Sequence, residues 1–177
     1  AIHAGLLNAR LRAACGLPVV EGADRVAAWL VKERGHFAPL MGQDISEAPM
    51  GSLSVENSTW PENPFDLPLE EAAKVGEEFE DNGSIWLGYY HEPRLIYADA
   101  AFRQGPWKAS DRRTVHLAVD AFAAAGTPLF APLSGEVFVA EYRAGHLDYG
   151  GVIILRHVTP EGDPFYTLYG HLDPEFL

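Results

Sequence analysis

The chain has 177 residues, and its 25 acidic against 13 basic residues give a formal net charge of −12. This balance argues against a nucleic-acid surface or an anionic membrane as partner, because both select clusters of Lys and Arg. Apolar residues make up 47% of the chain, enough for a folded core, yet no apolar run approaches the roughly 20 residues of a membrane span. The single cysteine, Cys15, excludes an internal disulfide framework and is expected to be a small buried hydrophobe.

Residues 1–40 predict a helical connector. Apolar residues recur at spacings of three and four from Leu6 to Ala14 and again from Ala23 to Arg34. Gly16 and Pro18 interrupt the pattern between the two runs, and Gly35 is a stop signal after the second. Two short helices follow from this pattern.

Residues 41–83 predict a Pro-rich arm that contains one short helix. Five prolines fall between positions 39 and 68, among Gly, Ser and Asn with little periodicity, which is typical of an irregular segment. Asp66 is an N-cap candidate, and acidic residues fill the turn after it. A helix over 68–80 is therefore expected.

Residues 84–177 predict a β domain. Short β-branched or aromatic runs alternate with Gly, Pro and Asp, which indicates antiparallel strands joined by turns. The candidate strands are Ile85–Tyr90, Arg94–Tyr97, Thr114–Val119, Thr127–Phe130, Glu136–Tyr142, Val152–His157 and Phe165–Tyr169. The fold class is thus mainly β with a helical N-terminal segment.

His116 and Asp120 are the candidate metal ligands, because an imidazole nitrogen and a carboxylate oxygen are donors that zinc accepts. In a continuous strand these two side chains share one face, and Leu117 and Val119 point to the core on the other. The two candidates are two alternations apart, so they converge on one ion only across a bend or bulge. Two ligands do not complete a tetrahedron, and a His and an Asp that only hydrogen-bond to their neighbours explain this fragment equally well.

A wider set of motifs accompanies this pair in order along the chain. They are His116-x-x-x-Asp120, the Gly126-Thr-Pro and Pro132-Leu-Ser-Gly135 turns, the run Gly150–His157 and Tyr169-Gly-His171-Leu. This set resembles the lysostaphin-type zinc endopeptidases of bacterial cell walls. The resemblance implies the antiparallel β fold of that family, the duplicated hybrid motif, here incomplete at its C-terminal end. It also implies zinc ligation by His116 and Asp120 and assistance to catalysis by His171.

The sequence departs from the family pattern at two points. Ala118 stands where the family usually has glycine between the His and the Asp, a change that a strand can absorb. The family's later His-x-His motif, which supplies the third zinc ligand, has no counterpart in the 177 residues. Both ends look like cuts inside a longer protein, so the missing motif is expected just downstream of Leu177.

A second resemblance involves segments outside these motifs. Arg12–Leu17, Glu92–Arg94 and Arg112–His116 resemble the middle of large fused bacterial proteins. Those proteins join a phosphotransferase-like domain, a lysostaphin-type domain and a class III aminotransferase that uses pyridoxal phosphate. This resemblance implies fused partner domains, pyridoxal phosphate in one of them and a cytoplasmic location. The peptidase reading alone implies instead the cell envelope or secretion.

Two functions remain open at this stage. The first is a zinc-dependent endopeptidase-like domain that hydrolyses peptide or amide bonds of the peptidoglycan type with a metal-activated water. His171, as a neutral imidazole, would take the proton of the water or hydrogen-bond the developing oxyanion. The second is a non-catalytic module that binds a small molecule or spaces the fused domains.

The other histidines and the aromatic residues are expected to be structural. His157 ends an apolar run and is predicted to support the fold, while His146 and His91 are predicted to lie in surface turns. The alternative for His91 is that it and Glu92 reach the metal from the flanking arm. Trp86 and its neighbours Tyr89 and Tyr90 are predicted to pack in the core.

Overall fold

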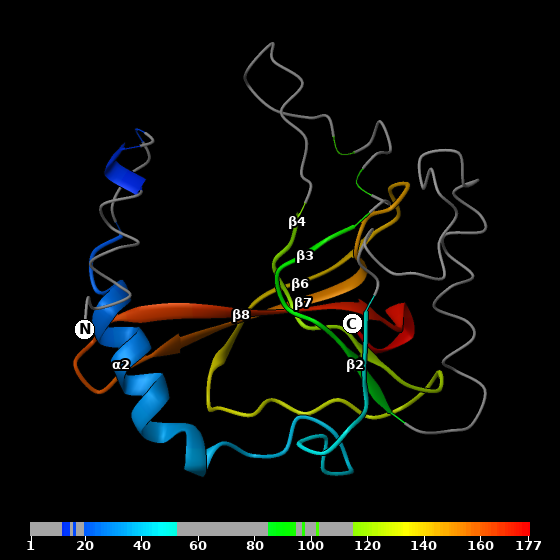
Figure 1. Ribbon diagram of the computed structural model, residues 1–177, viewed down its shortest axis with the longest axis horizontal. Helices are drawn as coiled ribbons and strands as arrows, with labels where there is room; N and C mark the ends of the chain where they lie inside the picture. The colour runs from blue at the N-terminus through cyan, green and yellow to red at the C-terminus, as the bar shows by residue number, and fades with distance from the viewer. Residues whose placement is uncertain are drawn as a thin grey trace. The chain divides into compact units, whose positions relative to one another are not determined.

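The computed structural model describes residues 12–14, 16, 20–52, 85–94, 97, 102 and 115–177 (Figure 1). Contacts divide the chain into two compact units: unit 1 holds residues 1–40 and 130–177, and unit 2 holds residues 41–129. The regular elements of the described residues are mostly strands, in three small sheets, with a short N-terminal helix. This confirms the mainly β class, whereas the duplicated hybrid motif and the three sequence-based domain ranges stay predictions.

The elements in chain order are α2 (Ala23–Glu33), η1 (Arg34–His36), β1 (Met50–Gly51), β2 (Trp86–Gly88), β3 (Glu92–Pro93), β4 (Val115–His116), β5 (Ala121–Phe122), β6 (Glu136–Arg143), β7 (Gly150–Val158), β8 (Pro164–Leu172) and η5 (Pro174–Phe176). The two η elements are single 3-10 turns. Within the part of the chain that the structure describes, none of the helices has the length and apolarity to cross a membrane.

Unit 1 contains an antiparallel sheet in the order β6-β7-β8, formed by consecutive hairpins (Figure 1). Each of the three predicted strands in this region lies inside the observed strand. Along β8 the side chains alternate, with Tyr166 and Leu168 exposed and Phe165 and Thr167 half-buried. This period of two is the signature of a strand with one covered face.

Helix α2 contacts the hairpin between β7 and β8 in unit 1. Arg25 donates two hydrogen bonds to the Asp163 carboxylate, at 2.6 and 2.5 Å, and the ring of Trp29 lies 5.8 Å from that of Phe165. The predicted helix over Ala23 to Arg34 is confirmed, although its last turn tightens into η1 and runs past Gly35. Of the helix predicted before it, residues 12–14 are helical and the rest lies outside the described residues, as does Cys15.

Unit 2 contains two small sheets, β1-β2-β5 and β3-β4. Its packing centres on Trp86 of β2 and Phe122 of β5, which are register partners with stacked rings, 3.9 Å between centroids and 7° between planes. Trp86 is buried, as predicted for an aromatic residue on a strand, whereas Tyr89 and Tyr90 are exposed, so the core prediction is wrong for those two tyrosines.

Three sequence predictions in unit 2 and at its boundary need correction. The strand expected over Thr114–Val119 stops at His116, and Leu117 and Val119 are 60% and 57% exposed instead of facing a core. The strand expected over Thr127–Phe130 is reduced to one bridge between Leu129 and Met41, because Pro128 has no N–H to donate to a ladder. The strand expected to begin at Arg94 lies instead at Glu92–Pro93. The helix expected over 68–80 lies outside the described residues.

Candidate metal centre

His116 and Asp120 lie side by side in unit 2. His116 ends β4, the chain bends at Ala118, and Asp120 precedes β5. The backbone N–H of Gly88 donates to the carbonyl of Asp120 at 2.9 Å, which fixes the far end of the bend against β2. Nε2 of His116 is then 3.5 Å from Oδ1 of Asp120. The bend that the two ligands need in order to converge is therefore present.

This separation fits a shared zinc ion. Zinc binds imidazole nitrogen and carboxylate oxygen at about 2.0–2.2 Å, and two such donors at corners of a tetrahedron are roughly 3.3 Å apart. The observed 3.5 Å is close to this value and lies beyond the usual range of a hydrogen bond. Among the described residues, no group of three or more His, Cys, Asp or Glu side chains is arranged to hold a metal. The geometry of the pair is thus compatible with two donors to one zinc ion.

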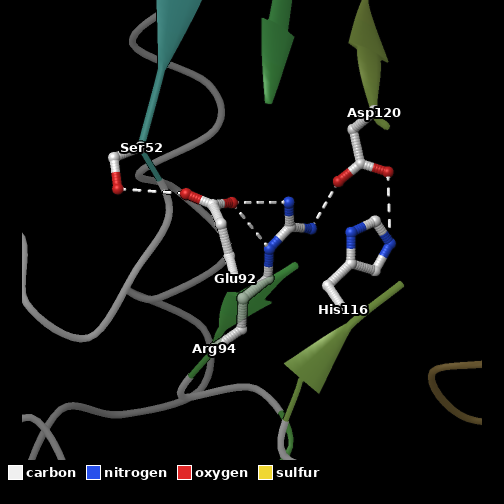
Figure 2. Close-up of polar contacts among 5 residues, drawn as sticks. All are labelled: Ser52, Glu92, Arg94, His116 and Asp120. Carbon is white, nitrogen blue, oxygen red and sulfur yellow. Dashed lines mark hydrogen bonds and ion pairs between the residues drawn. The ribbon is translucent and has the colours of Figure 1, made fainter. Parts of the chain in front are cut away.

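The second oxygen of Asp120 is held by Arg94 (Figure 2). Nη1 of Arg94 donates to Oδ2 of Asp120, while Nε and Nη2 donate to Oε2 of Glu92 at 3.2 and 2.8 Å. Ser52 completes the chain of contacts, because its hydroxyl donates to Oε1 of Glu92 at 3.0 Å. A continuous polar network therefore runs from Ser52 to His116.

Side-chain exposure increases along this network from Glu92 to Asp120. The side chains of Glu92 and Arg94 are 6% and 9% exposed, that of His116 is 13% exposed and that of Asp120 is 27% exposed. Buried charges of opposite sign are tolerated when their hydrogen bonds are made, and here one guanidinium serves two carboxylates. Of these four side chains, that of Asp120 is thus the most exposed to solvent.

Gly88 gives the guanidinium the room that it occupies. A Cβ atom at this position would lie 3.2 Å from Nη2 of Arg94 and 3.5 Å from Cβ of Asp120. These contacts are tight enough to displace the flexible end of the arginine. The glycine at the end of β2 therefore belongs to the packing of the site.

His171, the predicted catalytic histidine, belongs to β8 of unit 1. The register between β7 and β8 shifts between the pairs Gly151–Leu172 and Ile153–Tyr169, which marks a bulge that contains His171. His171 has φ 58° and its N–H donates to the carbonyl of Tyr149 at 2.7 Å. A left-handed backbone is uncommon for histidine and is frequent at functional sites. Alternation along the strand predicted neither the bulge nor this conformation.

Three further histidines behave as the sequence predicted. His157 is buried, with Nδ1 2.8 Å from the carbonyl oxygen of Ser134 and Nε2 2.9 Å from the Thr167 hydroxyl, so it is structural. His91 is exposed in the turn between β2 and β3, and His146 is exposed in the turn between β6 and β7.

Sequence reasoning missed the supporting role of Ser52, Glu92 and Arg94. The available signal was the spacing of Glu92 and Arg94, two residues apart, which places oppositely charged side chains on the same side of an extended segment. Its connection to Asp120 depends on tertiary structure, since Arg94 and Asp120 are 26 residues apart.

Comparison with known families gives a match that includes part of this site. Residues 114–176 match the model of peptidase family M23, the lysostaphin-type family, over about a third of the chain. This stretch of the chain is similar to that family, and it includes His116, Asp120 and His171. Ser52, Glu92 and Arg94 precede the matched residues. No curated protein and no solved structure showed significant similarity to the chain.

Proposed function

We propose that the protein carries a zinc-dependent endopeptidase site in which His116 and Asp120 hold the metal. The observation that carries this proposal is the 3.5 Å separation of His116 Nε2 and Asp120 Oδ1 inside the residues that match peptidase family M23. Bound zinc would supply Lewis-acid activation of a water molecule and of the scissile carbonyl. The substrate class is a peptide or amide of the peptidoglycan type, as the family match suggests.

The proposed roles of the three residues follow from the chemistry of their side chains. Asp120 contributes negative charge and His116 a neutral nitrogen, so the pair attracts a cation without neutralising it fully. His171 is proposed as the proton-transfer group, because an imidazole both accepts and donates a proton near neutral pH. Two protein donors alone bind zinc weakly, so the proposal requires a third ligand.

The alternative of a non-catalytic binding or spacing module receives less support. The family match favours a peptidase domain, and the two proposed metal ligands are adjacent. Fused phosphotransferase-like and aminotransferase domains, pyridoxal phosphate and a cytoplasmic location stay proposals that rest on the sequence resemblance.

The test is the zinc content of the full-length protein after dialysis against metal-free buffer. We expect close to one zinc per chain in the wild type and a large loss in His116→Ala. His91→Asn is the matched control, because His91 is an exposed histidine of the same unit and asparagine accepts its left-handed backbone at φ 65°. Zinc-free wild-type protein, or equal zinc in wild type and His116→Ala, would overturn the proposed site.

A further inference from the structure

The guanidinium of Arg94 binds two carboxylates, and it uses different nitrogen atoms for each of them. Nε and Nη2 hold one oxygen of Glu92, and Nη1 holds Oδ2 of Asp120 (Figure 2). Because the guanidinium is planar, the angles between its donors are fixed. The position of the Glu92 carboxylate therefore determines where Nη1 of Arg94 contacts Asp120.

We propose that Arg94, anchored by Glu92, is a positioning residue for the cation site. By holding Oδ2 of Asp120 it keeps Oδ1 turned toward Nε2 of His116, so both donors face the same ion. The inference rests on the proposed zinc site and extends it to residues that precede the lysostaphin-type match at 114–176. Carboxylate ligands of metals are commonly fixed by such hydrogen bonds from outside the ligand set.

The charge of Arg94 raises an opposing effect, because a cation beside a metal ligand repels the metal. Glu92 offsets it: the Glu92–Arg94 pair is neutral, with contacts at 2.8 and 3.2 Å, and both side chains are almost fully buried. Low local dielectric strengthens this pairing. Glu92, Arg94 and Asp120 together carry a net charge of −1, so negative charge remains for the cation, and the proposed effect of Arg94 is orientation.

The contacts also argue against Arg94 as a substitute for the metal. Nη1 binds Oδ2 of Asp120, whereas the oxygen that approaches His116 is Oδ1. A guanidinium in the place of the ion would contact the oxygen shared with the imidazole. The substitute model predicts that removal of Arg94 tightens zinc binding, and the positioning model predicts the opposite.

The experiment measures the zinc dissociation constant of the full-length protein by competition with a chelator. We expect Arg94→Ala to weaken zinc binding about 10- to 100-fold. Arg94→Lys should recover part of the loss, because one ammonium can reach Asp120 but lacks the fork that holds Glu92. Arg25→Ala is the matched control, since it removes an arginine–aspartate pair from unit 1, and its zinc affinity should equal that of the wild type.

The outcomes separate this inference from the proposed function. Zinc-free wild-type protein overturns the proposed function. Wild-type protein whose zinc depends on His116, with equal or tighter binding in Arg94→Ala, overturns the positioning role alone. If Arg94→Ala does not fold, Arg94→Lys and Glu92→Gln decide: weaker binding in both supports positioning, and wild-type affinity in either overturns it. Thermal melting of the metal-free variants identifies which of them are folded.

Discussion

Glu92 of β3 lies directly opposite His116 of β4 in the antiparallel register. Residues opposite each other on neighbouring strands project to the same face, so the anchor of Arg94 and the imidazole share one side of this sheet. The N–H of His91 donates to the carbonyl of His116 at 2.9 Å and extends the pairing by one contact. A strand pair of two residues each therefore joins the segment before the lysostaphin-type match to the candidate metal ligand.

Replacement of Asp120 should destabilise the fold as well as remove a metal donor. Asp120→Ala leaves Arg94, whose side chain is 9% exposed, with a donor that has lost its acceptor, at a cost of about 1–3 kcal/mol. Asp120→Asn keeps an acceptor oxygen and should cost less, while both variants lose zinc affinity. Urea unfolding of the metal-free proteins measures the difference. Equal stability of Asp120→Ala and wild type would show that the contact with Arg94 contributes nothing.

The substitution His171→Asn should leave the fold intact and abolish most of the catalysis. Asparagine accepts the left-handed backbone that His171 adopts at φ 58°, whereas a β-branched residue does not. His171→Asn should therefore fold and bind zinc like the wild type and lose hydrolysis by about 100- to 10,000-fold, the usual effect of removing a proton-transfer group. His171→Val should in addition lower the melting temperature. Zinc loss in His171→Asn would contradict the assignment of His171 to proton transfer.

The sequence predicted well where the structure depends on short-range pattern. The strands β6, β7 and β8 were predicted from β-branched or aromatic runs bounded by turn residues, and this local signal was enough because consecutive hairpins form the whole sheet. Exposure of Leu117 and Val119 was not predictable from alternation, since that argument assumes a strand that continues past His116. The chain bends after His116, so the side chains that follow no longer alternate between two faces of a strand.

The candidate metal ligands and the residues that support them also differ in how far the sequence predicts them. His116 and Asp120 are four residues apart and belong to a recognisable motif, so their association followed from the sequence. Ser52 and Glu92 are 40 residues apart, and their contact depends on where β1 and β3 fold. No periodicity encodes such a contact, which explains why the positioning residues were found only in the structure.

His157 should matter for stability and not for metal binding. It is 2% exposed, stacks on Phe165 with 4.8 Å between ring centroids, and contacts polar atoms through both ring nitrogens. His157→Ala removes this packing and leaves buried polar groups unpaired, for an expected loss of about 2–4 kcal/mol. The exposed control His146→Ala should stay within about 0.5 kcal/mol of the wild type. Denaturant unfolding measures both, and near-equal midpoints would contradict a structural role.

Gly151 is required by close approach of two strands. A Cβ atom at this position would collide with the backbone carbonyl of Leu172 on β8, and its distance to the Leu172 carbonyl carbon would be 2.8 Å. Gly151→Ala should therefore cost about 1–3 kcal/mol, as expected for an overpacked site. Gly42→Ala is the control, because nothing lies within 4 Å of a Cβ there. Comparison of the two unfolding midpoints tests the point, and equal midpoints would show that β8 shifts without cost.

The ion pair between α2 and the β7–β8 turn should make stability depend on acid pH. Hydrogen bonds from Arg25 lower the pKa of Asp163 below its ordinary value of 3.8. A carboxylate whose pKa is lower in the folded than in the unfolded state stabilises the fold above the unfolded pKa, and this contribution disappears as pH falls through the folded pKa. The melting temperature of Asp163→Asn should thus lie below that of the wild type at pH 7, and the gap should close below about pH 4. In an Arg25→Ala background the gap should be small at every pH, and a gap that persists there would assign the effect to another partner of Asp163.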